Sequence, residues 1–402
     1  MPLKRILFTL ILLQCAFSNS QSLRGLSVLN DSQVWVSGSK GFIGNYDKES
    51  FNTCVLSHEY QHKDFRDIHG FTINSAIIMS VADSGVLLKT WDGGKTWVEV
   101  FRDNDSGVFF DVIELTKNGE FGILLGDPLP SNPDHLYFRL SVDSGNHWIT
   151  VENGQWNKIS PKLNSLYAAS GSSARILDCW YNEITGLLNL KIIIGGGGDK
   201  GASIRMAEVN WNIEGQLQSE KVTNLSVPMP EEKGWGVYGL SEPIDGQIAV
   251  AGGHWKFPDG RPNLASNSTS SFTECDNGLF LLRYNKDNAL TIKPLRVCNY
   301  LSGAILVDKG LIITVGTTGL NQVKLPRKKN FPNNKLTWEF PHWKIQDFTI
   351  DSQSPKVPVD FEEIRSNPFK GLNAVGVSDS FVWVVGVSKT PKIIRIPLIL
   401  WQ

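Results

Sequence analysis

One short unit recurs along the chain, and this repeat constrains the fold more than any other feature of the sequence. The unit is an apolar stretch, a polar turn and a second apolar stretch that ends in a small residue, as in residues 24–38 (RGLSVLNDSQVWVSG). Two apolar stretches joined by a short polar turn are typical of a β-hairpin. A repeated unit of this kind indicates an array in which each copy buries its apolar face against its neighbours.

Copies of the unit can be placed along almost the whole chain. They span 24–38, 66–80, 110–126, 166–195, 238–252, 302–316 and 373–386. The first three copies end 42 and 46 residues apart, which matches a four-stranded propeller blade of about 40–50 residues. Patterns of helical period are scarce. The sequence therefore predicts an all-β fold, a seven-bladed β-propeller with four-stranded antiparallel blades, in which loop insertions lengthen the later intervals.

A second motif follows two of these units. It has the form Ser/Thr-x-Asp-x-Gly-x-Thr-Trp, known as an Asp-box, and occurs at 90–97 (TWDGGKTW) and at 141–148 (SVDSGNHW), where His147 replaces Thr. The carboxylate can accept hydrogen bonds from turn amides, the glycine permits a positive φ, and the tryptophan packs beside the hairpin. We therefore assign structural rather than catalytic roles to the motif positions Asp92, Gly94, Trp97, Asp143, Gly145 and Trp148.

Together these features resemble the BNR or Asp-box repeat propellers of the photosystem II stability/assembly factor type, especially the exported bacterial branch often labelled oxidoreductase. The resemblance covers nearly the whole chain and includes 23–26 (LRGL), 65–68 (FRDI) and 383–386 (WVVG). The chain departs from the family pattern because only two Asp-boxes remain. The resemblance implies an assembly factor that holds a protein.

Nothing in the residues supports an oxidoreductase. The sequence has no CxxC, no haem-attachment motif and no GxGxxG that enters a helix. The glycine run 195–198 follows a predicted strand and leads to another, so we interpret it as a turn or a close-packed blade position. We expect no cofactor.

The first 20 residues predict a cleaved secretory signal. Lys4 and Arg5 precede an apolar run at 6–13, and small residues around Ser20 suit a cleavage site. The run is too short to span a bilayer, and no other segment approaches a membrane span. We expect residues 21–402 to form a single propeller domain, secreted or periplasmic and monomeric.

Export would leave four cysteines in an oxidising compartment: Cys54, Cys179, Cys275 and Cys298. Three complete pairings are possible and the sequence does not choose among them. Some of these residues could instead be buried small apolar side chains. Their wide spacing makes a zinc site unexpected, and we predict no metal.

The charge balance argues against one class of partner. Lys and Arg number 39 and Asp and Glu number 40, which gives a formal charge of −1. A protein that binds the nucleic-acid backbone needs clustered excess basic residues. We therefore expect no nucleic acid, and an unknown protein or polymer as the ligand.

The repeat also identifies candidate binding residues, because the first strand of each propeller blade faces the central channel. Aligned positions place Arg24, Arg66, Asp67, Asp111 and Tyr238 on first strands. The two arginines, on neighbouring blades, could bind a carboxylate or phosphate bidentately. Alternatively, they pair with Asp67 and Asp111 and brace the blade interface.

One further candidate lies outside the aligned positions. His254 follows a strand and precedes a long insertion at 257–271, and long loops at a propeller face can bind partners. The alternative is that the imidazole simply packs beside Trp255.

Two functions are consistent with this sequence. The first is a secreted or periplasmic binding or assembly-factor scaffold, which we favour over an enzyme. The alternative is a glycoside hydrolase, because sialidases and xyloglucan-active enzymes also use Asp-box propellers. A sialidase needs an arginine triad and a Tyr/Glu pair, of which Arg24, Arg66 and Tyr238 could supply part.

Overall fold

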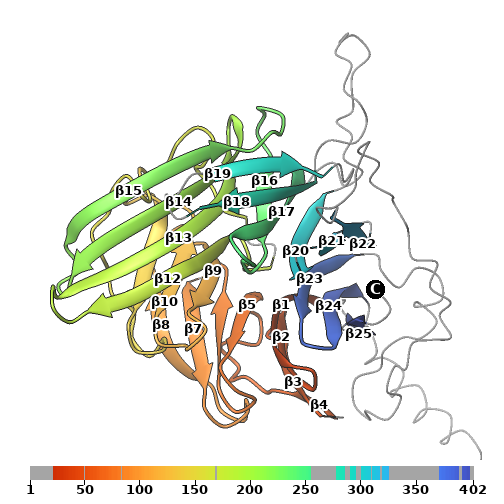
Figure 1. Cartoon of the computed structure of the whole chain (residues 1–402). Helices are drawn as coiled ribbons and strands as arrows, with labels where there is room; N and C mark the ends of the chain where they lie inside the picture. The colour runs from red at the N-terminus through yellow and green to blue at the C-terminus, as the bar shows by residue number, and fades with distance from the viewer. Residues whose placement is uncertain are drawn as a thin grey trace, which may run out of the picture.

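The computed structural model describes residues 21–48, 50–82, 84–167, 170–254, 278–285, 290–295, 300–308, 310–316, 319–325, 371–388 and 392–398. The regular structure of this part of the chain is β-strand, and the strands pair antiparallel with their sequence neighbours (Figure 1). The fold is therefore all-β, as the sequence predicts, and its recurrent antiparallel sheets are consistent with a propeller.

The N-terminal strands form regular groups. These strands are β1 (Gln21–Asn30), β2 (Gln33–Gly38), β3 (Ile43–Asp47), β4 (Ser50–Thr53), β5 (Phe65–Gly70), β6 (Ala76–Ser80), β7 (Gly85–Thr90), β8 (Val98–Asp103), β9 (Phe110–Leu115), β10 (Gly122–Gly126) and β11 (Tyr137–Ser141). The groups are β1–β4, β5–β8 and β9–β11, each a meander of antiparallel neighbours.

The remaining strands continue the pattern with one enlarged sheet. They are β12 (Ala174–Asn182), β13 (Leu187–Gly198), β14 (Gly201–Asn212), β15 (Leu217–Ser226), β16 (Trp235–Leu240), β17 (Gln247–His254), β18 (Leu279–Tyr284), β19 (Leu290–Pro294), β20 (Leu301–Asp308), β21 (Leu311–Gly316), β22 (Gly319–Lys324), β23 (Leu372–Val377), β24 (Phe381–Ser388) and β25 (Lys392–Pro397). The groups are β12–β15, β16–β19, β20–β22 and β23–β25.

The hairpin register explains why the repeat is visible in the sequence. In most groups the pairing of the first two strands shifts by one residue at the aligned position, which is a β-bulge. The bulged residues are Arg24, Arg66, Asp111, Tyr238, Ser302 and Asn373. The residues aligned by sequence spacing are therefore structurally equivalent.

The glycines near the ends of the second strands have a common steric cause. A Cβ atom there would collide with a carbonyl oxygen of the first strand, from the residue two before the bulge. The glycine–carbonyl pairs are Gly38–Ser22, Gly126–Phe109, Gly252–Gly236, Gly316–Tyr300 and Gly386–Gly371. Close backbone approach, rather than a positive φ, requires glycine at these positions.

One sequence prediction is wrong. The fourth hairpin was expected to begin near residue 166, but its first strand is β12, which starts at Ala174 and pairs with β13. The chain around Ser165 instead makes an isolated bridge to Gly197. The spacing rule failed here because strands β12–β15 are longer than most strands of the other groups. The start of the first strand therefore does not lie at the distance from the second strand that the other hairpins show.

The glycine run 195–198 lies inside β13, as the close-packed interpretation predicts. Gly197 pairs with Gly236 of β16, so the run joins two successive groups. A Cβ at Gly196 would collide with Ser165, and one at Gly198 with Pro161.

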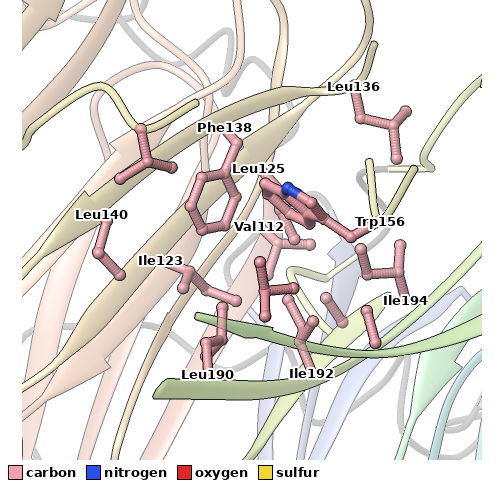
Figure 2. Close-up of a cluster of buried hydrophobic side chains, with 14 of the residues drawn as sticks. Val112, Ile123, Leu125, Leu136, Phe138, Leu140, Trp156, Leu190, Ile192 and Ile194 are labelled. Carbon is pink, nitrogen blue, oxygen red and sulfur yellow. The ribbon is translucent and has the colours of Figure 1, made fainter. Parts of the chain in front are cut away.

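The hydrophobic core lies between successive groups. One cluster fills the space between β9–β11 and β12–β14, where Phe138 meets Trp156 edge-to-face with ring centroids 4.6 Å apart (Figure 2). Full burial of one such large side chain contributes about 1.5–3 kcal/mol. Comparable clusters lie between the other neighbours, and one of them joins β1–β2 to β23–β24.

The first and last groups also share backbone hydrogen bonding. Gln21 and Ser22 of β1 pair with Ser388 and Val387 of β24. The side-chain amide of Asn373 donates to the carbonyl oxygen of Leu23 at 2.6 Å. The two ends of the described chain are therefore adjacent in space (Figure 1).

Several expectations concern residues outside the described ranges, including the signal at 1–20, Cys275, Cys298 and the insertion at 257–271. Cys54 and Cys179 are free thiols, and burial raises the pKa of each to about 12. Among the described residues, no helix is long and apolar enough to cross a membrane.

Candidate functional site

The first strands surround a cavity of about 640 Å³. Its walls come from β1, β5, β9, β20 and β23, together with the chain around residues 170–175 and 241–242. These segments are far apart in sequence, so the cavity exists only because the groups are arranged around it.

The bulge residues of β1 and β5 place two arginines close enough to interact. The Nε of Arg24 is buried and has no hydrogen-bond partner, and Arg24 donates no hydrogen bond to any residue that the structure describes. Burial, and then repulsion from Arg66, lowers the pKa of the Arg24 guanidinium, against the attraction of the Asp64 carboxylate. Arg66 is held by Asp64, with 2.8 Å between Nε and Oδ2, and its guanidinium lies 5.9 Å from the ring centre of Phe109.

Three tyrosines continue from these arginines. Tyr300 interacts electrostatically with Arg24 and Arg66, and burial raises the pKa of its hydroxyl to about 12. Its ring meets Tyr238 edge-to-face at 4.7 Å, and Tyr238 stacks on Tyr167 at 4.6 Å. The five residues form one continuous group, which we call the arginine–tyrosine cluster: Arg24, Arg66, Tyr167, Tyr238 and Tyr300.

Two glycines make room for the aromatic end of this cluster. A Cβ at Gly236 or at Gly197 would collide with the ring of Tyr167, so the ring lies directly against the backbone where β13 meets β16. Asp127 fixes the segment before Tyr167, since its Oδ1 accepts hydrogen bonds from the Ser165 hydroxyl at 2.9 Å and the Leu166 amide at 2.8 Å.

Two carboxylates act on Tyr167 within the arginine–tyrosine cluster. Burial, followed by the charges of Asp127 and Asp111, raises the pKa of Tyr167 to about 12. Asp111 is fully buried. The arginine–tyrosine cluster therefore carries positive charge at Arg24 and Arg66, and the carboxylates of Asp127 and Asp111 lie within electrostatic range of Tyr167.

The structure separates Asp67 from the arginine beside it in sequence. Its two carboxylate oxygens accept hydrogen bonds from the backbone amides of Ile68 and Ile113, both at 2.9 Å. Asp67 thus links β5 to β9 and lines the cavity, whereas Arg66 pairs with Asp64. Asp67 therefore connects neighbouring strand groups, as one of the two sequence hypotheses expects. It does so through hydrogen bonds from backbone amides and not through an ion pair with Arg66.

A set of charged residues separate from the arginine–tyrosine cluster lines the cavity. Arg175 contacts Glu114 at 2.9 Å and Glu242 at 3.5 Å. Burial raises the pKa of Glu114 to about 8, against the opposing charge of Arg175, and raises the pKa of Asp67 to about 7. The cavity therefore holds carboxyl groups that retain protons near neutral pH.

His254 packs against a tryptophan, but this residue is Trp235, whereas Trp255, named in the structural alternative, lies outside the described residues. The side chain is buried, its ring meets Trp235 edge-to-face at 5.5 Å, and Nε2 lies 3.2 Å from the carbonyl oxygen of Lys233. These contacts account for its position without a ligand, and its role in binding stays a prediction.

The two Asp-box turns are organised by their own side chains. Asp92 accepts hydrogen bonds from the Thr96 amide at 2.9 Å and the Thr96 hydroxyl at 2.7 Å. Asp143 accepts one from the His147 amide at 2.9 Å. Gly94 and Gly145 have positive φ values of 84° and 78°. Among the described residues, no group of three His, Cys, Asp or Glu is arranged to hold a metal ion.

Asp64, Phe109 and Tyr300 are not among the site residues predicted from the repeat, although the sequence carries a signal for them. Each lies two residues before a bulge residue, at the position whose carbonyl oxygen approaches a second-strand glycine in most groups, including those of Phe109 and Tyr300. Residues i and i−2 of a strand share one face, so this position belongs beside the aligned arginines. Tyr167 has no such signal, because it lies outside the strands.

Comparison with family models and with curated proteins gives no match. Solved structures that resemble the chain include YCF48 from Cyanidioschyzon merolae, with TM-score 0.51 and 12% identity over 94% of this chain and 96% of that chain. Another is described as YCF48 bound to D1 peptide, with TM-score 0.47 and 11% identity over 94% and 92%. At such identity the likeness concerns the fold. The chain thus shares the fold of YCF48, a photosystem II assembly factor, in agreement with the resemblance seen in its repeats.

Proposed function

We propose that residues 21–402 form a single seven-bladed propeller, closed where β1 pairs with β24. The successive strand groups, the core clusters between neighbours and the cluster between the last and first groups support this architecture. The similarity to a solved YCF48 structure over 94% of the chain supports one domain rather than several. Residues 1–20 would direct export to the periplasm or the exterior, where the propeller would act as a monomer.

We propose further that the protein is a binding scaffold of the assembly-factor kind, whose arginine–tyrosine cluster holds a protein segment through a carboxylate. Arg24 carries this proposal, because it is a half-buried guanidinium without an ion-pair partner among the described residues. A charge removed from water without a partner raises the free energy of the protein. A bound carboxylate would lower it by charge-assisted hydrogen bonds.

The neighbours of Arg24 favour the same ligand. Arg66 adds a second positive charge within electrostatic range, and an anion between the two would relieve their repulsion. The rings of Tyr300, Tyr238 and Tyr167 continue from that point, edge-to-face and then stacked. Tyr238 is buried, and the half-buried rings of Tyr300 and Tyr167 on either side of it suit an apolar or aromatic side chain next to the carboxylate. A peptide offers both features together.

The test is calorimetric titration with an acetylated peptide of sequence AAFA that ends in a free carboxylate, compared with its C-terminal amide. We expect the acid to bind at least about tenfold more tightly than the amide, since one charge-assisted hydrogen bond contributes about 1.5–3 kcal/mol. Arg24→Ala should abolish this preference. Arg102→Ala removes an arginine paired with Glu99 and Glu59 and should leave it unchanged.

Two results would overturn the proposal. Equal affinity for the acid and the amide would remove the carboxylate as the recognised group. Hydrolysis of sialyl or β-glucan substrates that disappears in Asp111→Asn or Arg66→Ala protein would instead favour the glycoside hydrolase.

A further inference from the structure

The sheet β12–β15 extends further than its neighbours. β13 and β14 have 12 residues each, whereas the paired strands of the other groups have four to ten, and Figure 1 shows their long arrows reaching away from the other sheets. The turns 182–187 and 212–217 lie side by side because Leu187 pairs with Asn212. We call residues 178–190 and 209–220 the hairpin end.

Large apolar side chains are exposed at the hairpin end. They are Trp180 at 44%, Tyr181 at 44%, Ile184 at 97% and Ile213 at 73%. These are four of the nine exposed large hydrophobic residues in the described part of the chain, although the hairpin end contains only 25 residues. Such a concentration, with a tryptophan and a tyrosine together, is typical of a protein-binding surface.

The edge of β12 is available to another strand. β12 pairs with β13 on one side, and no described strand pairs with its other side. Tyr181 is in register with Leu188 and Trp211, which face the core, while Trp180 is in register with Asn189 and Asn210 on the opposite face. A strand added at this edge would therefore contact Trp180 on one face and Tyr181 on the other.

The charge at the hairpin end is of one sign. Its charged residues are Asp178, Glu183, Glu214 and Glu220. Lys191, just outside these bounds, is in register with Asp178 but pairs with Glu208 at 2.9 Å, and Lys221 follows Glu220. Glu220 accepts hydrogen bonds from the amides of Gln155 and Trp156. The other three carboxylates form no ion pair with the residues that the structure describes. A partner that supplies lysine or arginine would be complementary.

We propose that the hairpin end docks an extended segment of a partner protein in which basic and apolar side chains alternate, added as a strand to the free edge of β12. The apolar side chains of the segment would cover Trp180 or Tyr181, and its basic side chains would pair with Asp178, Glu183 and Glu214. The hairpin end would bind a basic segment, whereas the arginine–tyrosine cluster would bind a carboxylate. The two sites therefore take different ligands and can be tested separately.

The probe is a capped synthetic peptide of sequence KVKVKVK, compared with EVEVEVE and with KVKPKVK, in which proline removes a ladder donor. Calorimetry on the full chain should show binding of the first peptide at least about tenfold tighter than of either other peptide. Trp180→Ser with Tyr181→Ser should weaken that binding at least about tenfold. Glu183→Lys with Glu214→Lys should reverse the preference toward EVEVEVE, and this reversal does not depend on the apolar residues.

Matched controls distinguish binding at the hairpin end from nonspecific binding to exposed apolar side chains. Val55→Ser and Trp91→Ser remove other exposed apolar side chains, at 78% and 51% exposure, and should leave the affinity unchanged. Equal binding of the three peptides, or insensitivity to the Trp180 and Tyr181 changes, would overturn the proposal. A dimer in sedimentation that becomes a monomer in the Trp180→Ser, Tyr181→Ser protein would also overturn it, because a second copy of the chain would then be the occupant.

Discussion

Charged side chains are unevenly balanced both in the arginine–tyrosine cluster and along the cavity. At one position Arg24 lies beside Arg66 without an ion-pair partner of its own in the described chain, and at another Glu114 and Glu242 share the single guanidinium of Arg175. Both arrangements are unfavourable in a partly dehydrated interior unless ligands, protons or water compensate them. The local pKa shifts are the consequence, and they link the stability of the fold to pH.

We expect stability to fall as pH rises from about 6.5 to 8. The pKa values of Asp67 and Glu114 rise from 3.8 and 4.5 to about 7 and about 8, so the folded chain retains protons that the unfolded chain has lost, and raising the pH favours unfolding by at most about 1.4 kcal/mol per pH unit for each group. Below about pH 6.5 His69 opposes this trend, because burial lowers its pKa from 6.5 to about 4.

Thermal unfolding at pH 6.5 and pH 8 measures this effect. Glu114→Gln should reduce the difference between the two midpoints, whereas Glu59→Gln, at an exposed ion pair, should leave it unchanged. A midpoint that rises between pH 6.5 and 8 would contradict the prediction.

At the scale of elements, the third strand of one group holds the Asp-box turn of the next. The side-chain amide of Asn45 in β3 donates to the carbonyl oxygen of Gly93 at 3.1 Å. Lys89 in β7 donates in the same way to the carbonyl oxygen of Ser144 at 2.7 Å and to Oδ1 of Asn146 at 2.9 Å. The Asp-boxes therefore contribute to contacts between groups as well as to their own turns.

Lys89→Met should lower the free energy of unfolding by about 1.5–3 kcal/mol, because hydrogen bonds from a charged donor are lost and the carbonyl of half-buried Ser144 is left without its partner. The methionine side chain would keep the packing against Phe71, over whose ring the ammonium lies at 4.8 Å. Urea unfolding gives the measurement, with Lys95→Met at an exposed turn position as the control. Equal losses in the two variants would show that Lys89 does not connect the sheets.

At the scale of the whole molecule, the contacts between β23–β25 and β1–β4 decide whether the sheets form one cooperative unit. Beside the β1–β24 pairing, Arg395 of β25 lies over three rings, those of Tyr46, Phe381 and Trp383, at 5.6, 4.6 and 5.5 Å. Tyr46 belongs to β3, so this cation–π contact joins the two ends of the chain. The amide of Ser380 also donates to Asp31 at 2.8 Å.

Arg395→Ala should destabilise the protein by about 1–3 kcal/mol and accelerate global unfolding, because the contact joins the two ends of the chain. Unfolding rates in guanidinium chloride provide the measurement. Arg283→Ala, at an exposed position on β18, should leave the rate unchanged. If the two variants unfold equally fast, the end-to-end contact contributes nothing to the barrier.

Sequence spacing predicted the elements well wherever the hairpin unit kept its length. The aligned positions Arg24, Arg66, Asp111 and Tyr238 are indeed equivalent bulges. It failed for the fourth hairpin, whose strands are nearly twice as long and whose first strand begins at Ala174. A local pattern identifies a hairpin of standard length, but it does not show where an extended one begins.

The candidate site was predictable only in part. Its bulge residues follow from the repeat, and a period-2 argument would have added Asp64 and Tyr300. The partners of these residues do not follow from spacing. Arg66 pairs with Asp64, which the repeat alignment does not single out, and Tyr167 enters from a segment between strands.

The sequence by itself determined the all-β antiparallel fold, the register of most hairpins and the glycines that close them, because alternation of apolar residues and close backbone approach act over a few residues. Only the tertiary structure decided which charges meet and which rings stack. Tyr167, Tyr238 and Tyr300 contact one another across three strand groups, and Arg24 lacks an ion-pair partner because of what those groups place around it. Such contacts depend on how sheets far apart in the chain are arranged around one cavity.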